Sequence, residues 1–496
     1  MKQDAGHQAA LITTAEFFRF FIKSLIGIVL ARLLTPAELG SYRQLFLIYS
    51  TISALLMMGI PQSILYFLPR QNPEERKAYI GRLINISFGL SVIFALLLLI
   101  LKDAIATWFN NPALSYLLVI YAVYPIFMFS SSLYNYFMLG LSKAKSAAKF
   151  TLFSVGCDAV LILGVAFWTK SLPYITIAVV ASAFLQWLYT RFALRGFPRL
   201  QKIPKGFLKS QFAYALPLGI SSMIGMLSVQ LDKLVISSYF DPAAFAVFSI
   251  GAAELPFVSI FTNSVNSVLL PAMSSQADIS DMAMRYKAAV RKNALIIFPL
   301  TTLFFLFAEP IFYILYGSKY LSAVPYFKVY LLILPLRIAT FGIIFMALGK
   351  TKQVMLNSIL TLAANLVLNI LLVRRIGMMG AALATVIVTW MSAGVYLLWM
   401  KTQLKLRLGD FFALWQVIKT AAAVLGAGLA AYLILKLCPN IYVAYGAALI
   451  AFCLLYLLLG YQVKAIHPYD IELARSFVLS LFRKKKPATE APERNG

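Results

Sequence analysis

Charged residues, cysteine and histidine are all scarce in this sequence. Only 12% of its residues are charged and 61% are hydrophobic, whereas about a quarter of the residues of an ordinary soluble domain are charged. The two histidines and three cysteines show no CxxC or metal-ligand spacing. We therefore expect no disulfide framework, no zinc or haem site, and no cofactor.

Motifs that bind nucleotides or carry hydrolytic chemistry are missing too. The sequence contains no GxxxxGK[ST], HExxH or GxSxG pattern and no large polar loop that could hold an acceptor site. We therefore predict that the protein is not an enzyme and does not hydrolyse ATP. An ion gradient or consumption of the product would have to supply the energy for any transport.

Long apolar runs fill most of the chain. A transmembrane helix needs about 20 mostly apolar residues, and runs of this kind recur from residue 10 to residue 463. They predict an all-α, polytopic membrane protein with about fourteen transmembrane helices, at residues 10–33, 44–68, 83–101, 113–141, 148–169, 172–190, 211–238, 244–273, 293–308, 321–348, 353–373, 378–400, 411–435 and 441–462.

Basic residues are distributed unequally between alternate loops. Thirty of the 44 Lys and Arg fall on one side, eight fall on the other, and six lie within predicted spans. By the positive-inside rule, both termini are expected to lie in the cytoplasm of a multi-pass inner-membrane protein. Topology and anionic lipid then account for most of the net charge of +26, and nucleic acid is not an expected partner. The RKKK run at 483–486 is expected to face lipid headgroups.

A weak internal repeat suggests how the helices are organised. The segment after the first span, LLTPAELGSYRQLF, resembles SYFDPAAFAVFSIG after the seventh, so that Pro36 matches Pro242. Copies six helices apart form a parallel repeat, although chance similarity between apolar helices is a competing explanation. The expected domains are an N-lobe of helices 1–6 (1–205), a C-lobe of helices 7–12 (206–402), helices 13 and 14 (403–463) and a cytoplasmic basic tail (464–496).

Ionisable residues inside the first predicted span share one face. Such residues cost about 2.5–3.5 kcal/mol each at the bilayer centre, so they usually face a hydrated cavity or a partner. Glu16, Arg19 and Lys23 stand at i, i+3 and i+7. Glu16 can neutralise one cation, and the other needs an anion or an acid from another helix. This face is predicted to be an anion-binding wall of a central cavity; alternatively, Lys23 snorkels or pairs with Asp232 or Glu254.

Further polar positions complete the candidate site. Asp232 lies on a small, polar stripe of the seventh span, Lys233 points about 100° away and is expected to have a different partner, and Glu254 precedes Pro256 in the eighth. The candidate substrate-binding residues are Arg19, Lys23, Glu16, Lys233, Asp232 and Glu254, and the candidates for ion coupling are Asp158, Asp232 and Glu254.

Other residues within the spans have structural interpretations. Asn357, Asn365 and Asn369 are predicted to hold helices together. Prolines inside apolar runs are expected to bend helices: Pro61, Pro125, Pro217, Pro256, Pro271, Pro299 and Pro335.

Four stretches resemble the polysaccharide-export branch of the multidrug/oligosaccharidyl-lipid/polysaccharide exporter superfamily: LARLLTPAELGSYRQLF, LDKLVISSYFDPAAFAVFS, EPIFYILYGSKYLSAVPYF and GKTKQVMLNSILTLAANLVLNILLVRRIGMMGAALAT. The resemblance implies two six-helix lobes around a cavity walled by the first, second, seventh and eighth helices. It also implies a flippase that moves an undecaprenyl-pyrophosphate-linked oligosaccharide to the periplasm by alternating access, for surface polysaccharide biosynthesis.

The resemblance also suggests residue roles and partners. In related peptidoglycan-precursor flippases, basic residues of the first helix contact the pyrophosphate, and Arg19 and Lys23 correspond to them by helix; the last two helices would form a groove for the polyprenyl tail. The expected partners are a lipid-linked oligosaccharide and membrane lipids, with a polysaccharide polymerase and a chain-length regulator as candidates.

Three alternative functions stay open. A cation or drug antiporter of the same superfamily would be favoured if Asp158, Asp232 and Glu254 formed an acidic cation site. A peptidoglycan-precursor lipid flippase and a membrane-embedded enzyme such as a sugar polymerase are the others.

Overall fold

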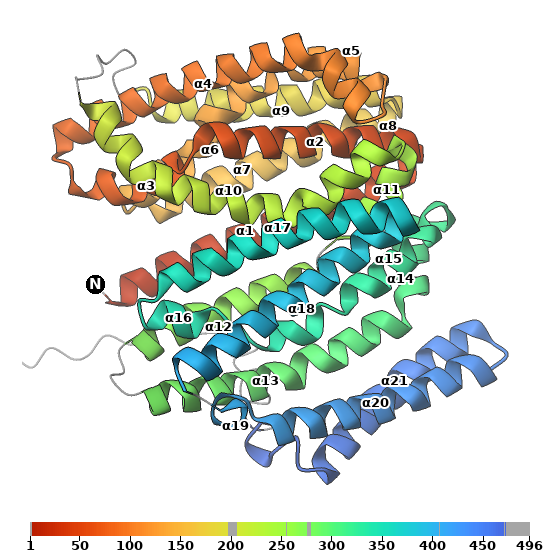
Figure 1. Cartoon of the computed structure of the whole chain (residues 1–496). Coiled ribbons are helices and arrows are strands. Elements are labelled where there is room, and N and C mark those ends of the chain that lie inside the picture. The colour runs from red at the N-terminus through yellow and green to blue at the C-terminus, as the bar shows by residue number, and fades with distance from the viewer. Residues whose placement is uncertain are drawn as a thin grey trace, which may run out of the picture. The chain divides into compact units, whose positions relative to one another are not determined.

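The computed structural model describes residues 2–196, 206–253, 255–274, 279–405, 407–470 and 472 (Figure 1). Within these ranges every regular element is helical and no strand occurs. The prediction of an all-α polytopic fold is confirmed. The basic run at 483–486 lies outside the described residues.

The helices of the first half of the chain begin at residue 2 and are α1 (Lys2–Leu33), α2 (Pro36–Met57), α3 (Ile60–Phe67), η1 (Leu68–Arg70), α4 (Pro73–Trp108), α5 (Ala113–Tyr121), α6 (Tyr124–Gly140), α7 (Ala144–Asp158), η2 (Ala159–Leu163), α8 (Gly164–Thr169), α9 (Leu172–Ala193) and α10 (Phe207–Tyr239).

The helices that follow are α11 (Pro242–Gly251), α12 (Pro256–Ser274), α13 (Ile279–Leu306), α14 (Ala308–Tyr316), η3 (Ser318–Ala323), α15 (Val324–Leu331), η4 (Leu334–Ile338), α16 (Ile343–Ala347), α17 (Thr351–Ile376), α18 (Met378–Gln403), α19 (Leu408–Phe411), α20 (Leu414–Leu437) and α21 (Ile441–Gln462).

Each of the fourteen predicted spans overlaps one helix or several consecutive helices. By length and composition, nine helices of the described ranges can cross a membrane, or up to 12 if each bent pair is one span. Helix α1, which carries Glu16, Arg19 and Lys23, is not among these.

The two repeated stretches each begin a helix in the same way. Thr35 caps α2 and forms a capping box with Glu38, and Asp241 caps α11 by accepting a hydrogen bond from the Ala244 N–H at 2.7 Å. In both helices a proline follows the cap, where its missing N–H costs nothing. The likeness read from the sequence therefore corresponds to two equivalent helix starts.

The prolines act in two ways. Pro217, Pro271 and Pro299 lie inside α10, α12 and α13. Pro61 and Pro125 stand instead at the starts of α3 and α6, after breaks at which the chain turns by 46° and 52°. Some predicted bends are therefore interruptions between two shorter helices.

The chain forms two compact units, one of residues Met1–Ile260, Ala308–Ile333 and Leu348–Tyr396, and one of Phe261–Phe307, Leu334–Ala347 and Leu397–Gly496. In the first unit, α1 packs along α7, and α6 packs against α4, α7 and α9. In the second, α20 packs against α13 and α21 around a core of Val424, Ala427, Ala431, Ala448 and Phe452.

Candidate functional site

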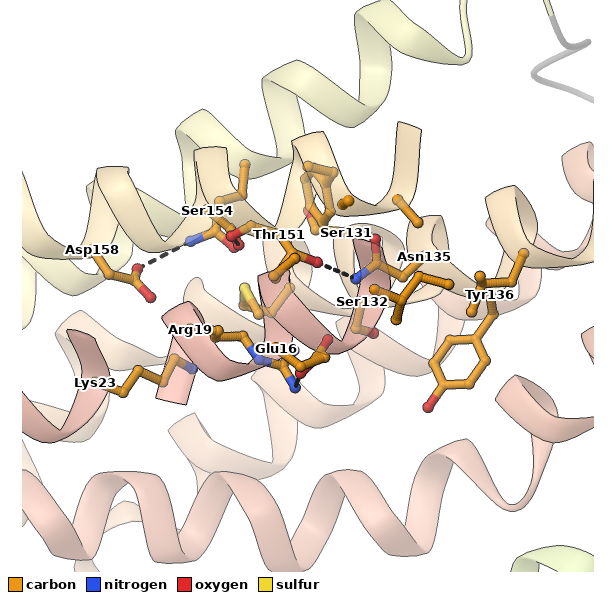
Figure 2. A pocket seen from close by; sticks show the side chains of 18 of the residues that line it. Glu16, Arg19, Lys23, Ser131, Ser132, Asn135, Tyr136, Thr151, Ser154 and Asp158 are labelled. Atoms are coloured by element: carbon orange, nitrogen blue, oxygen red, sulfur yellow. Dashed lines mark hydrogen bonds and ion pairs between the residues drawn. The ribbon is translucent and has the colours of Figure 1, made fainter. Parts of the chain in front are cut away.

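A pocket of about 370 Å³ lies in the first unit, between α1, α6, α7 and α9. Figure 2 shows the polar side chains that converge on it from these helices. The lining residues are Ile12, Ala15, Glu16, Arg19 and Lys23 of α1; Tyr124, Met128, Ser131, Ser132, Asn135, Tyr136 and Leu139 of α6; Ala147, Ala148, Phe150, Thr151, Ser154 and Asp158 of α7; and Gln186 of α9.

The charged residues of α1 face this pocket. Arg19 forms an ion pair with Glu16 one helical turn away, and these side chains are 43% and 39% exposed. Lys23 is also exposed, and among the described residues it has no ion pair within 4.0 Å. The ion pair that the i, i+3 spacing of Glu16 and Arg19 predicts is therefore present, and Lys23 is the second cation, outside that pair.

Asp158 is the acid that another helix contributes. It ends α7, directly before the π-helical turn η2, and its Oδ1 accepts hydrogen bonds from the Ser182 hydroxyl at 2.6 Å and the Gln186 amide at 3.1 Å. Both donors lie on α9, so the carboxylate is held in place. It attracts Lys23 electrostatically across the pocket, whereas the sequence suggested only Asp232 or Glu254 as acidic partners for Lys23.

Uncharged polar groups line the rest of the pocket. The Asn135 amide donates to Thr151 Oγ1 at 3.0 Å, and its Oδ1 is buried without a hydrogen-bond partner. Ser132 donates to the Phe129 carbonyl at 2.9 Å, and Ser154 donates to the Thr151 carbonyl at 2.9 Å. The sequence analysis did not single out these residues, although Thr151, Ser154 and Asp158 stand at i, i+3 and i+7 in an apolar run, which was the available signal.

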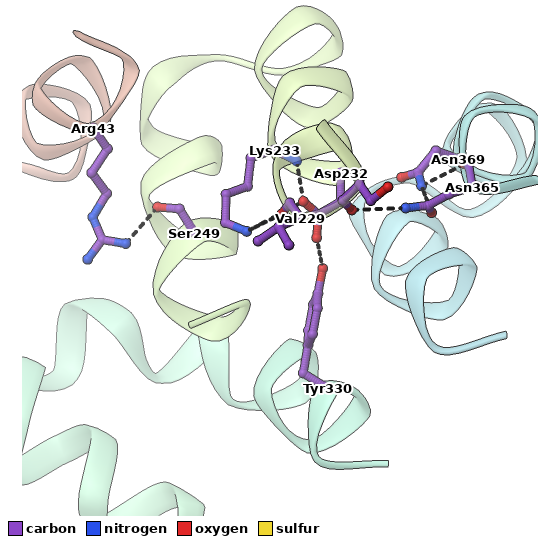
Figure 3. A network of polar contacts seen from close by, with 9 residues as sticks. Arg43, Val229, Asp232, Lys233, Ser249, Tyr330, Asn365 and Asn369 are labelled. Carbon is purple, nitrogen blue, oxygen red and sulfur yellow. Dashed lines mark hydrogen bonds and ion pairs between the residues drawn. The ribbon is translucent and has the colours of Figure 1, made fainter. Parts of the chain in front are cut away.

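Asp232 lies in a separate polar network of the first unit (Figure 3). The side chain is 2% exposed and accepts hydrogen bonds from the Tyr330 hydroxyl and, at 2.7 Å, from the Lys233 N–H. The expectation that Lys233 needs a different partner is wrong, because its flexible side chain folds back along the helix. Its Nζ lies 3.5 Å from Asp232 Oδ1 and 3.2 Å from the Val229 carbonyl.

Asn357 and Asn365 of α17 hold helices together, as predicted, whereas Asn369 bonds within α17. Asn357 donates to the Ser392 hydroxyl of α18 at 2.6 Å, and Asn365 donates to the Ser228 carbonyl of α10 at 3.4 Å. Asn369 donates to Asn365 Oδ1 at 2.7 Å, within α17. These contacts place two amide side chains beside the helix that carries Asp232 (Figure 3).

The structure therefore groups only some of the candidate residues. Glu16, Arg19, Lys23 and Asp158 line one pocket, whose lining includes neither Asp232 nor Lys233. Glu254 lies outside the described residues. Within the described ranges, no group of three or more His, Cys, Asp or Glu side chains could hold a metal ion.

The sequence is similar to a known protein family and to another membrane protein. The family model described as "Polysaccharide biosynthesis protein" matches residues 29–325. An uncharacterized membrane protein of Methanocaldococcus jannaschii is 22% identical over 424 residues, which cover 76% of this chain and 79% of that protein.

Two solved structures share the fold along most of the chain. The lipid II flippase MurJ in an inward closed conformation has a TM-score of 0.75 and 16% identity, covering 96% of this chain and 100% of that one. An inward-facing multidrug resistance transporter of the MATE family, within the MOP superfamily, has a TM-score of 0.64 and 16% identity, covering 78% and 94%.

Proposed function

This chain belongs to the polysaccharide biosynthesis protein family, and on that premise we propose that it is a flippase for an undecaprenyl-pyrophosphate-linked oligosaccharide. It carries the headgroup from the cytoplasmic to the periplasmic leaflet by alternating access, without covalent chemistry. The proposed orientation places both termini in the cytoplasm of a bacterial inner membrane, as the distribution of basic residues predicts.

The physical task explains why a polar pocket within the bilayer is needed. A pyrophosphate and several sugars crossing bare hydrocarbon would leave charges and many hydroxyl groups without partners, at a cost of several kcal/mol for each group. A pocket lined by two cations, Lys23 and Arg19, and by hydroxyl and amide groups supplies both kinds of partner.

Lys23 is the observation on which the proposal rests. Its ammonium faces the pocket without an ion pair within 4.0 Å in the described part of the chain, so it can bind an anion without first losing a partner. Arg19 lies one turn away and can add a planar pair of donors, but a diphosphate must compete with Glu16 for them.

The charge balance distinguishes this function from cation export. Two bases and two acids line the pocket, and Oδ1 of Asp158 is already occupied by Ser182 and Gln186. Cation export would call for an excess of acidic groups. Asp158, Asp232 and Glu254 are retained as proposed ion-coupling residues, and antibiotic efflux that depends on this protein would favour the antiporter.

The fold likeness to a lipid II flippase favours one alternative, a peptidoglycan-precursor flippase. Both functions require a site for a polyprenyl diphosphate, so the pocket suits either. Depletion separates them, because loss of peptidoglycan-precursor flipping would be lethal, whereas loss of surface polysaccharide export would leave cells viable.

The pyrophosphate role of Lys23 and Arg19 is tested by neutralisation. We expect Lys23→Gln and Arg19→Gln to reduce surface polysaccharide, and to slow flipping of a fluorescent undecaprenyl-diphosphate sugar in proteoliposomes. The expected loss is roughly 10- to 100-fold, because each variant removes a hydrogen bond between charged groups.

Lys149→Gln is the matched control, since Lys149 is exposed on α7 and does not line the pocket. All variants are compared at equal membrane abundance. Unchanged export by both pocket variants would remove Arg19 and Lys23 from the site.

A further inference from the structure

We propose that the end of the pocket around Asn135 is a subsite for the sugar ring attached directly to the diphosphate, so that the protein recognises that sugar as well as the phosphates. This inference rests on the proposed function and assigns the second half of the same pocket.

The polar atoms at this end are mostly hydrogen-bond acceptors. Asn135 Oδ1 is buried without a partner, and the Ser132 hydroxyl already donates to the Phe129 carbonyl of its own helix. Their oxygen atoms can therefore still accept. A ligand that fits must bring O–H or N–H donors, as the hydroxyl and acetamido groups of a sugar do, and a phosphate brings acceptors only.

The Asn135 side chain is held in one orientation. Its amide donates to Thr151 Oγ1 at 3.0 Å, which fixes the N–H side toward α7 and leaves Oδ1 for a ligand. A buried amide oxygen without a partner costs about 1–3 kcal/mol, and a sugar donor at this position would recover that cost.

The spacing of the two ends fits a sugar joined to a diphosphate. Asn135, Ser132 and Tyr136 lie at one end of the pocket, Lys23 and Asp158 lie at the other, and Glu16 and Arg19 lie between them (Figure 2). Glu16, in the middle of the pocket, stands seven positions from Lys23 on α1, about 10 Å along the helix, and Asn135 lies on the far side of Glu16 from Lys23 (Figure 2). The diphosphate would then lie beside Lys23, and the first sugar beside Asn135.

The pocket volume limits how many sugars of the glycan can bind inside it. At about 370 Å³ it lies at the small end of the range of ligand sites, about 300–1,000 Å³. It therefore holds the diphosphate and the adjoining ring, and the remaining sugars extend beyond it. The specificity predicted here is for the first sugar and not for the whole repeat unit.

The test compares two defined lipids on the purified full-length protein in nanodiscs: undecaprenyl diphosphate, and undecaprenyl diphosphate carrying one N-acetylglucosamine. The wild-type protein is expected to bind the sugar-bearing lipid more tightly. Asn135→Ala should remove this preference, roughly 5- to 30-fold for a lost buried hydrogen bond, and leave affinity for the sugar-free lipid unchanged. Lys23→Gln should weaken binding of both lipids.

Two further variants keep the test decisive. Asn357→Ala removes an asparagine that bonds Ser392 outside the pocket, and it should retain the sugar preference. Ser132→Ala removes a second acceptor with little change in volume, so it tests the same subsite if Asn135→Ala does not fold, and it should also reduce the preference.

The outcomes separate the two proposals. Equal wild-type affinity for both lipids, or a sugar preference that survives both Asn135→Ala and Ser132→Ala, would overturn the subsite and leave the flippase proposal standing. Failure of the wild-type protein to bind either lipid would overturn the proposed function and the subsite with it.

Discussion

Arg291 and Asp470 form the most complete ion pair of the second unit. Two guanidinium nitrogens contact the two carboxylate oxygens at 2.9 and 2.7 Å, and the side chains are only 16% and 13% exposed. Asp470 also accepts the His467 N–H at 3.0 Å. The pair joins α13 to the segment that follows α21, so that two charged side chains tie distant parts of the sequence together.

This pair gives a prediction about pH. Burial by itself would raise the pKa of the Asp470 carboxyl, but hydrogen bonds from Arg291 and the His467 N–H, together with the charge of Arg291, hold it below its ordinary value. Because the folded-state pKa is lowered, the carboxylate stabilises the fold at any pH above the unfolded-state pKa of about 3.9. This stabilisation is lost as the pH falls through the folded-state pKa.

We therefore expect Asp470→Asn to lower the thermal unfolding temperature in detergent at pH 6 to 7, and the difference from wild type to shrink below about pH 4. Asp281→Asn, at an exposed position of α13, is the control and should have a smaller effect. A difference that stays constant from pH 7 to pH 3 would contradict the assignment.

Individual residue pairings could be predicted only where they are local. Glu16 and Arg19 lie one turn apart on one helix, and their ion pair follows from the sequence spacing. The acid that shares a pocket with Lys23 could not be predicted, because any acid on a neighbouring helix could lie there. The position of Asp158 in this pocket depends on how α1 packs along α7, which the sequence does not state.

Among the helices, the break between α2 and α3 depends on two glycines. Gly59 has a φ of +75°, and a Cβ there would lie 2.2 Å from the Ala215 carbonyl oxygen. A Cβ on Gly219 of α10 would lie 2.4 Å from the Met58 carbonyl carbon. The backbones therefore approach as closely as only glycine permits, which fixes the bend against α10.

Gly59→Ala is accordingly expected to destabilise the protein. The positive φ alone costs about 1–3 kcal/mol, and the clash with α10 adds to it. Thermal unfolding of the detergent-solubilised protein would measure the loss. Gly89→Ala in α4 is the matched control, because nothing lies within 4 Å of a Cβ there, and it should be neutral or stabilising by up to about 1 kcal/mol. Equal effects would refute the packing argument.

Helices were predictable from the apolar runs, but their interruptions were not. The predicted span 44–68 contains the break at Met58 and Gly59, because hydropathy does not change where the chain bends. The π-helical turn after Asp158 is equally invisible, since Ala159–Leu163 is uniformly apolar. Composition shows which segments can lie in the bilayer. The place where a helix bends depends on its neighbours from other parts of the chain.

Across the whole molecule, two cations cap the ends of α1 and α14. Arg32 of α1 donates to the Leu315 carbonyl at 3.0 Å and to the Ile314 carbonyl, in the last turn of α14. Lys319 of η3, directly after α14, donates to the carbonyls of Arg32 and Leu34 at 3.3 and 3.4 Å, at the end of α1. Each cation satisfies carbonyls at the negative end of a helix. On the proposed orientation these caps lie on the periplasmic side.

Removing both caps should favour opening on that side. The combined variant Arg32→Ala, Lys319→Ala loses about 1–2 kcal/mol of charge–carbonyl interaction. We expect roughly 5- to 30-fold faster maleimide labelling of Ser249→Cys, a residue 5% exposed, in a chain whose three native cysteines are replaced. Lys170→Ala, exposed on the same predicted side, is the control. Unchanged labelling would mean that the caps do not hold this side closed.

The candidate site could be predicted only in part. Charge placement on α1 indicated a hydrated wall, because Glu16, Arg19 and Lys23 share one face. The opposite walls of the pocket come from α6, α7 and α9, whose lining residues stand more than 100 positions after those of α1. The sequence contains no signal that such distant residues meet. Asn135 illustrates this, since an asparagine among aromatic residues resembles any interhelical contact until its unpaired oxygen is located.

Equal numbers of bases and acids in the pocket have an energetic consequence for transport. The two acids, Glu16 and Asp158, offset the two bases, Arg19 and Lys23, in formal charge, so on the proposed function we expect the membrane voltage to do little work on the return of the empty pocket. On the proposed function, the loaded pocket also carries the negative charge of the diphosphate. Its outward passage from a negative cytoplasm would gain about 2.3 kcal/mol per elementary charge for each 100 mV crossed, so we expect the voltage to favour the loaded step and not the return.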